Sequence, residues 1–256
     1  MTERAWLGRA VAAAVGVAFA APLVVLLVQA VADQWRAPML LPGRLGTRGL
    51  QAAISGEAGD ALLSSLEVAV AATTVALLLG WPAARVLDDS RLRRPTLVLV
   101  LLAMPLLVPA YATGTGLAEW FLRLGLADGR LGLVLAHLTM VLPYVVLVLA
   151  SGFGERLADL EEMAATAGLG PARRLAQVTL PAVRPTLAAA GLLGFLVSWS
   201  QYGLSLAVGG GLPMLPIVLL PFVGTDPEVA AALSLLFLAP AIAALALAAH
   251  ASRRPS

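Results

Sequence analysis

Residues 131–153 read LGLVLAHLTMVLPYVVLVLASGF and contain no charged side chain. About 20 mostly apolar residues make a helix long enough to cross the hydrocarbon core of a bilayer. Five other segments have a comparable length and character, namely residues 10–32, 61–86, 96–117, 186–208 and 229–249. Because these runs are continuous and do not alternate, they indicate helices and not the strands of a membrane barrel. The sequence therefore predicts an all-α, multi-pass membrane protein with six transmembrane helices.

The composition of the whole chain agrees with this prediction. Apolar residues make up 60% of the 256 residues and charged residues 12%, and the mean hydropathy is +0.90. Soluble domains are nearer 45–50% apolar and about 25% charged, so an ordinary water-soluble domain is excluded. The length suits a single membrane domain over residues 1–256. We expect no nucleic-acid partner, because the arginines that give the net charge of +2 are spread around the apolar spans.

Two residue types are missing from the chain, and both absences limit its chemistry. Without cysteine there is no disulfide, thiolate nucleophile or Cys-ligated metal. Without lysine, all 17 basic residues are arginine, and a standard P-loop lacks the side chain that reaches the β- and γ-phosphates of ATP. We therefore expect no cofactor on this chain and place any ATP hydrolysis on a separate chain.

The distribution of arginine predicts the orientation of the chain in the membrane. With the N-terminus inside, the inner face holds twelve arginines, Arg4, Arg9, Arg85, Arg91, Arg93, Arg94, Arg156, Arg173, Arg174, Arg184, Arg253 and Arg254. The outer face then holds five, Arg36, Arg44, Arg48, Arg123 and Arg130. Because cytoplasmic loops carry the excess of basic residues, both termini are predicted to be cytoplasmic.

The N-terminal segment also has features of a cleavable signal peptide. Two arginines precede its apolar run, and the run ends in Ala-Val-Ala at residues 30–32. The run of about 22 residues is longer than the 7–15 residues of a signal-peptide core. We therefore favour a first transmembrane helix over residues 10–32, and cleavage, which would leave five spans, is the alternative.

Residues 160–185 read LEEMAATAGLGPARRLAQVTLPAVRP and lie between the fourth and fifth predicted spans. Acidic residues near the start of a helix over residues 159–167 match the helix dipole, and Gly168 suits its left-handed C-terminal position. Pro171 suits the first turn of a second helix, which Pro181 and Pro185 are expected to break before the fifth span. Charge alone predicts an amphipathic segment that lies on the inner membrane surface and contacts anionic membrane lipid.

The order of residues in this segment resembles the EAA loop of ABC importer permeases of the binding-protein-dependent kind. That pattern is Glu-Ala-Ala, three residues, Gly, nine residues, Ile, one residue and Leu-Pro. The matching positions here are Glu162, Met163, Ala164, Gly168, Val178, Leu180 and Pro181. Met163 stands where the first alanine is usual, and Val178 replaces the isoleucine. The resemblance covers residues 60–250, and FLVSWSQYGLSLAVGGG at residues 195–211 is similar to the fifth span of thiamine and polyamine importers.

This resemblance implies a non-catalytic permease subunit in a bacterial inner membrane. A short cytoplasmic helix between the fourth and fifth spans would dock on a separate ATPase subunit. The coupling residues that the resemblance implies are Glu162, Met163, Ala164, Ala165, Gly168, Leu180 and Pro181. The other implied partners are a second permease subunit, identical or related, and an extracytoplasmic solute-binding protein. Iron, sulfate, molybdate and phosphonate importers have permeases of similar layout, so the solute stays open.

Polar side chains inside the predicted spans are candidates for a translocation pathway. In a continuous fifth span, Ser198, Gln201, Tyr202 and Ser205 share one helix face. The alternative is that these side chains only hydrogen-bond neighbouring helices. For Glu67 we favour a carboxylate that reaches water near the outer end of its span. For His137 we favour a packed, hydrogen-bonded side chain over a gate or proton site.

Two other classes of function fit the sequence less well. A membrane-embedded enzyme would have to rely on His137 and His250, the only histidines, and the chain lacks both H-E-x-x-H and G-x-S-x-G. An ion-coupled carrier would often show several intramembrane charges or repeated broken helices. A carrier or a membrane scaffold therefore stays as the alternative, and binding of an ATPase discriminates it from a permease.

Overall fold

The computed structural model describes residues 2–36, 38–88, 92 and 94–252. Its long apolar helices are α1 (Thr2–Ala30), α3 (Gly56–Asp88), α6 (Arg130–Ala150), α9 (Leu180–Trp199) and α12 (Pro227–Ser252). Within the described residues, five helical segments are long and apolar enough to cross a membrane, and a bent helix pair is a sixth candidate. Four of the arginines used to predict the orientation, Arg91, Arg93, Arg253 and Arg254, lie outside the described residues.

The bent pair corrects the prediction of a straight third span over residues 96–117. Helix α4 (Pro95–Ala103) continues as the 3₁₀ turn η1 (Met104–Leu107), and α5 (Ala110–Arg123) leaves at an angle of 95°. The bend falls at Val108, which is extended with φ −98° and ψ 134°. Because Pro109 follows it, Val108 is pushed out of the helical region of backbone space.

The fifth span also differs from its predicted bounds of 186–208. Helix α9 ends at Trp199, and a separate helix α10 (Tyr202–Val208) begins after Gln201, whose ψ of 80° interrupts the helix. At its other end, α8 (Pro171–Arg174) and the π-helical segment η2 (Leu175–Thr179) run into α9 without interruption.

The expectation that Pro181 and Pro185 break this helix is therefore wrong. Proline removes one backbone hydrogen bond and crowds the carbonyl four residues earlier. The wide π turn of η2 lies directly before Pro181, and its backbone closes with a bond from the Leu180 N–H to the Leu175 carbonyl. This widening provides the space that a proline ring needs within a continuous helix.

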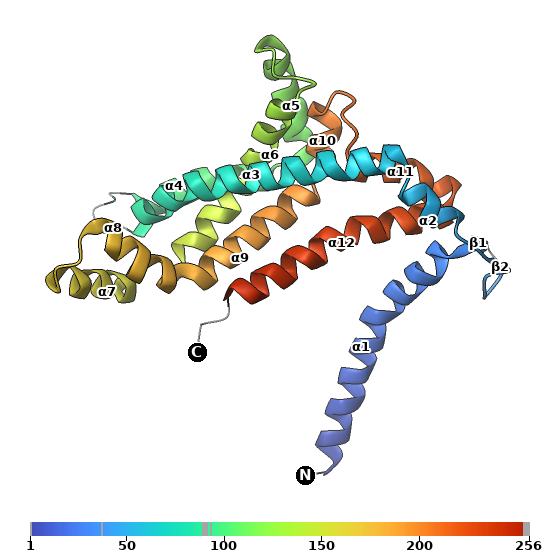
Figure 1. The fold of residues 1–256 in the computed structure, drawn as a ribbon, viewed down its shortest axis with the longest axis horizontal. Coiled ribbons are helices and arrows are strands. Elements are labelled where there is room, and N and C mark those ends of the chain that lie inside the picture. Colours follow the sequence, from blue (N-terminus) through green and yellow to red (C-terminus); the bar gives the residue numbers. More distant parts are fainter. Residues whose placement is uncertain (1, 37, 89–91, 93, 253–256) are drawn as a thin grey trace.

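The core of the bundle is formed by α3, α6, α9 and α12. Helix α3 packs against α6 and α9, and α9 packs against α12; α3, α9 and α12 lie side by side in Figure 1. Small residues allow the close approach of these helices, because a Cβ on Gly194 would lie only 2.8 Å from Val145. The short apolar helix α11 (Leu215–Thr225) packs against α3 and α12, next to an irregular segment at residues 209–214.

Helix α1 diverges from this bundle, as Figure 1 shows. Residues 8–25 are all exposed, and the helix joins the core only through its last turns, where Leu26 and Ala30 pack against α12 and its neighbours. Its apolar surface is therefore left for membrane lipid or for a partner protein.

A small hairpin and a short helix follow α1. Strand β1 (Ala32–Gln34) pairs antiparallel with β2 (Arg44–Leu45), and an irregularity in β1 separates the two paired positions. Helix α2 (Arg48–Ala53) comes next and packs on α12. A Cβ on Gly49 would lie 2.8 Å from the Glu228 carbonyl, so only glycine allows this approach of α2 to α12.

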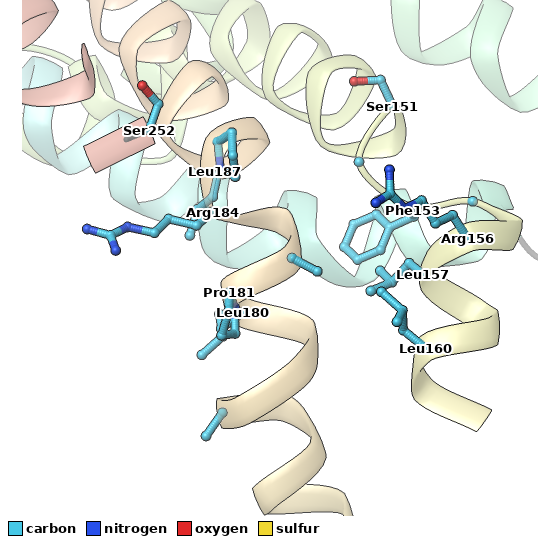
Figure 2. A pocket seen from close by; sticks show the side chains of 15 residues that line it. Ser151, Phe153, Arg156, Leu157, Leu160, Leu180, Pro181, Arg184, Leu187 and Ser252 are labelled. Atoms are coloured by element: carbon cyan, nitrogen blue, oxygen red, sulfur yellow. The ribbon is translucent and has the colours of Figure 1, made fainter. Parts of the chain in front are cut away.

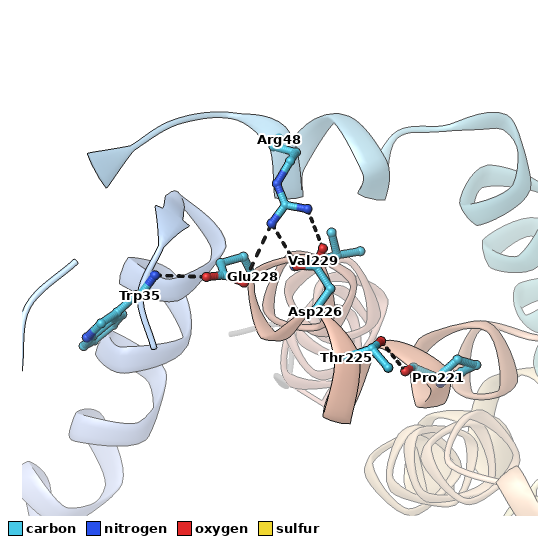
Figure 3. Close-up of polar contacts among 7 residues, drawn as sticks. All are labelled: Trp35, Arg48, Pro221, Thr225, Asp226, Glu228 and Val229. Carbon is cyan, nitrogen blue, oxygen red and sulfur yellow. Dashed lines mark hydrogen bonds and ion pairs between the residues drawn. The ribbon is translucent and has the colours of Figure 1, made fainter. Parts of the chain in front are cut away.

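An ion-pair cluster fastens this region to the start of α12 (Figure 3). We call Trp35, Arg48, Asp226 and Glu228 the hairpin cluster. Arg48 pairs with both carboxylate oxygens of Asp226 and lies 3.7 Å from the Glu228 carboxylate. The Glu228 carboxylate also accepts a hydrogen bond from the backbone N–H of Trp35 at 3.0 Å. The Asp226 side chain also accepts the Val229 N–H at 3.3 Å, which is a helix N-cap contact. The hydrogen bond from Arg48 lowers the pKa of the Asp226 carboxyl from its ordinary value.

Candidate functional site

The segment that joins α6 to α9 folds as helix, turn and helix at one end of the bundle (Figure 1). Helix α7 (Glu155–Thr166) begins four residues earlier than the predicted helix. Its end agrees with the prediction: Gly168 has a φ of +82°, its N–H bonds the Ala165 carbonyl, and the Leu169 N–H bonds the Ala164 carbonyl. This pair of bonds is a Schellman motif, in which glycine accepts the left-handed conformation without strain.

Helix α7 has one face against its own chain and one face towards solvent. Leu157 and Ala164 are buried and Glu161 is half-buried, which matches the spacing of a single helix face. Glu162, Met163 and Ala165 are exposed, and Met163 is the most apolar of them, with 67% of its surface accessible. Ala164, one of the coupling residues that the resemblance implies, is buried against its own chain.

A second ion-pair cluster holds the inner face of α7 to the membrane helices. We call Arg85, Glu161 and Thr179 the α7 cluster. The Glu161 carboxylate accepts a hydrogen bond from Arg85 at the end of α3 and another from Thr179 in η2. The Arg85 guanidinium also lies over the Phe153 ring, 5.3 Å from its centroid. One carboxylate therefore connects α7 to two different membrane helices.

Glu161 and Thr179 were not among the predicted site residues. The available signal was the spacing of Leu157, Glu161 and Ala164, which puts Glu161 on the inner face and its neighbour Glu162 on the outer face. The partner Arg85 lies 76 residues away in sequence, so no local pattern reveals it.

The predicted residues Leu180 and Pro181 lie on the other side of this segment. Both line a half-open cavity of about 780 Å³ between α7, the start of α9 and the end of α12. Figure 2 shows Arg156 and Leu160 on the α7 side of this cavity and Leu187 on the α9 side, while the Arg184 side chain extends away from α7.

The four predicted pathway residues do not share one helix face, because the helix is interrupted at Gln201. Ser198 and Ser205 are buried, while Gln201 and Tyr202 are half-buried. His137 of α6 contacts both serines, with Nδ1 2.8 Å from the Ser198 hydroxyl and Nε2 3.1 Å from the Ser205 hydroxyl. His137 is therefore a packed, hydrogen-bonded residue, as expected, and it joins the two sides of the break.

The hydrogen bonds assign the protons in this contact. The Ser205 hydroxyl donates to the Gln201 carbonyl at 2.5 Å, so it must accept from His137 Nε2–H. In a neutral imidazole, His137 Nδ1 then accepts from the Ser198 hydroxyl. This arrangement fits a neutral imidazole with its proton on Nε2.

Glu67 lies at the surface of the bundle. Its carboxylate is 3.3 Å from Arg130 at the start of α6, and both side chains are more than half exposed. Among the described residues, no group of three His, Asp or Glu side chains is arranged to hold a metal ion.

The fold, together with the segment that joins α6 to α9, defines a multi-pass helical membrane protein with an amphipathic helix, α7, across one end. No family model matches the chain. The molybdenum transport system permease protein ModB of Mycobacterium tuberculosis is 34% identical over 211 residues, which cover 76% of this chain and 79% of ModB. The putrescine transport system permease protein PotI of Escherichia coli is 32% identical over 191 residues, covering 69% and 68% of the two chains.

A solved structure shares the fold. A chain in the crystal structure of a bacterial ABC transporter involved in the import of alginate, an acidic polysaccharide, matches with a TM-score of 0.70 and 16% identity over 96% of both chains. Together with the sequence relatives, these findings show that the chain belongs to the type I ABC importer permeases, in the polyamine/molybdate-like branch. It is a membrane transport subunit.

Proposed function

We propose that the chain is the membrane subunit of an ATP-driven importer that brings a small solute into a bacterial cytoplasm. It works in the inner membrane with both termini and α7 on the cytoplasmic side, where the excess of arginine belongs. ATP is bound and hydrolysed by a separate ATPase subunit, because a chain without lysine cannot build a standard P-loop.

The division of α7 into two faces carries this proposal. The inner face is tied to α3 and η2 through Glu161, while Glu162, Met163 and Ala165 are free to contact another protein. We assign this exposed face to the ATPase contact, with Gly168 fixing where the helix ends. When the ATPase subunits close, α7 moves as a rigid body and pulls on both membrane helices through the α7 cluster.

The transport pathway is completed by a second permease subunit, either identical or related. The exposed apolar surface of α1 supports such a partner. Gln201 and Tyr202, at the break between α9 and α10, are the pathway candidates that we retain, because Ser198 and Ser205 are occupied by His137. An extracytoplasmic binding protein delivers the solute. The sequence relatives are named for molybdenum and for putrescine, so membership of the family does not fix the solute.

Co-purification with candidate ATPase subunits in detergent tests the proposal. Glu162→Arg reverses a charge on the exposed face of α7, and Gly168→Pro removes the residue that ends the helix. Both variants are expected to lose the ATPase. Glu57→Arg is the matched control, because it makes the same change at an exposed position near the start of α3, at the other end of the bundle.

Retention of the ATPase by both α7 variants would overturn the assignment of the contact. If no ATPase binds the unaltered chain, the carrier and scaffold alternatives become the better explanations. If the Glu57→Arg variant also loses the ATPase, the charge reversal acts through general misfolding and not through α7.

A further inference from the structure

The hairpin that follows α1 exposes large apolar side chains at its turn. Leu40 is 91% exposed, Leu41 76% and Leu45 69%, and Met39 is 48% exposed. None of these four side chains belongs to the three apolar clusters that form the core of the described residues. We call Met39, Leu40, Leu41 and Leu45 the hairpin patch. Its own chain leaves this patch uncovered, which is typical of a surface that contacts another molecule.

The turn that presents the hairpin patch is held by hydrogen bonds. Trp35 donates its indole N–H to the Met39 carbonyl at 3.0 Å, and the Met39 N–H bonds the Arg36 carbonyl at 3.0 Å. The Gly43 N–H bonds the Gln34 carbonyl at 2.9 Å. The Trp35 ring points away from the hairpin cluster in Figure 3. The exposure of the patch is therefore a property of a defined turn.

Two helices of membrane-spanning length end beside this hairpin (Figure 1). The apolar span of α1 covers Gly8–Ala30 and β1 begins at Ala32, while α12 begins at Pro227. At 1.5 Å per residue the span of α1 is about 34 Å long, which is close to the roughly 30 Å of the hydrocarbon core. The Trp35 N–H bonds Glu228 in the first turn of α12. The hairpin is thus fixed to two span ends, at the level of the lipid headgroups.

The charges around the patch suit the same level of the membrane. Residues 34–47 contain Arg36 and Arg44 and no aspartate or glutamate, and both arginines are exposed. In the membrane interface, a guanidinium reaches lipid phosphate while leucine and tryptophan side chains enter the upper acyl region. A protein partner is the other kind of occupant for such a surface. Leucine is under-represented among the anchor residues of protein interfaces, yet it supplies three of the four residues of the patch.

We propose that the hairpin patch contacts membrane phospholipid beside the end of α1, with its leucines in the upper acyl region and Arg36 and Arg44 at the phosphates. The hairpin then lies in the membrane interface, and it holds the corner between α1 and α12 at that depth. This inference rests on the two span ends and not on the ATPase contact. It therefore succeeds or fails independently of the proposed function.

Spin-label accessibility tests the proposal, because a chain without cysteine accepts a single label at Leu40→Cys. The labelled chain is placed in nanodiscs of phosphatidylcholine and phosphatidylglycerol that hold one chain each. Collisions of the label are measured with oxygen, which concentrates in lipid, and with a water-soluble nickel chelate. Two controls carry the same label, Phe19→Cys in the middle of α1, where Phe19 is 77% exposed, and Asp159→Cys at an exposed position of α7.

The ratio of oxygen to nickel collisions at Leu40→Cys should lie between the high ratio at Phe19→Cys and the low ratio at Asp159→Cys. Leu45→Cys should give a similar intermediate ratio, because it probes the same patch with the other three side chains in place.

Three results would overturn the proposal. A ratio at both patch positions as low as that at Asp159→Cys would mean that the patch lies in water and is left for a protein partner. A ratio equal to that at Phe19→Cys would place the hairpin in the hydrocarbon core and not in the interface. Few collisions with either reagent would show that protein, and not lipid, covers the patch.

Discussion

The hairpin cluster and the α7 cluster lie near opposite ends of α3, and they differ by one buried carboxylate. In the hairpin cluster, Arg48 and Asp226 are 49% and 23% exposed, but Arg48 also lies 3.7 Å from the Glu228 carboxylate, which is only 1% exposed. In the α7 cluster, Arg85 is 41% and Glu161 20% exposed. A buried carboxylate depends strongly on its cation, whereas a partly hydrated pair contributes little to stability.

This difference separates two uses of an ion pair. The hairpin cluster fixes α2 and the hairpin on α12, and its cost of opening is high. The α7 cluster joins α7 to α3 and η2, and it can loosen at low cost while still restricting the direction in which α7 moves. In the proposed importer, the hairpin cluster keeps the outer side fixed, and the α7 cluster leaves a movable connection on the ATPase side. This arrangement allows a movement of the ATPase to be transmitted to the membrane helices.

The largest effect on stability is expected from Arg48→Met. This change leaves Glu228 buried without its cation, so unfolding in mixed micelles should require about 2 kcal/mol less free energy; Arg48 is half exposed, which keeps the loss below that of a fully buried pair. The double variant Arg48→Met with Glu228→Gln should recover part of the loss, because the uncompensated charge is gone. If the double variant is no more stable than the single one, burial of the charge is not the cause.

A smaller effect on stability, of about 1 kcal/mol, is expected from Glu161→Ala, because the α7 cluster is partly hydrated. Its main consequence is that α7 loses its connection to α3 and η2. Since the chain has no cysteine, spin labels can be placed at Met163→Cys on α7 and Leu78→Cys on α3 without background. The distribution of distances between the labels should broaden in Glu161→Ala.

Glu162→Ala is the control for this measurement, because Glu162 is next in sequence but faces away from the cluster. It should leave the distance distribution unchanged. A distribution that is equally narrow in the Glu161→Ala variant would mean that α7 is held by apolar packing, through Leu157 and Ala164, and not by its ion pair.

The smallest effect is expected from titration of Asp226. The hydrogen bond from Arg48 lowers the pKa of Asp226 in the folded chain from its ordinary value, so its contribution to stability is present at pH values above that ordinary pKa. That contribution is lost as the pH falls from about 4 through the lowered pKa, because the unfolded chain then binds the proton first. Unfolding of Asp226→Asn should depend less on pH in this window than unfolding of the unaltered chain. Asp60→Asn, at an exposed position, should keep the original dependence.

Local patterns in the sequence predicted those structural elements that depend on neighbouring residues alone. The continuous apolar runs indicate the long helices, and the glycine at position 168 predicts the left-handed end of α7 correctly. The two ion-pair clusters depend on tertiary contacts. Arg48 and Asp226 are 178 residues apart, so neither position has a neighbour in sequence that indicates the pair.

Proline shows why the bounds of the spans could not be read reliably. Pro109 follows a residue forced into an extended conformation and coincides with a bend of 95°. Pro181 lies in the first turn of α9, and the helix continues through it because the preceding turn is π-helical. The same residue type therefore ends one helix and is absorbed by another, and the difference lies in backbone geometry that no apolar pattern contains.

The π turn of η2 also has a consequence for how such a segment changes by insertion and deletion. A π turn holds one residue more than an α turn, and one residue of an α-helix corresponds to a rotation of about 100°. Deletion of one residue from this turn, such as Ala176, would remove the extra residue and leave an α turn, so α8 and α9 would keep nearly the same orientation about their common axis. Deletion of one residue from a regular α turn of α9 would instead rotate α8 by about 100° about that axis. The π turn is therefore the place in this helix where loss of a single codon would change the orientation of α8 least.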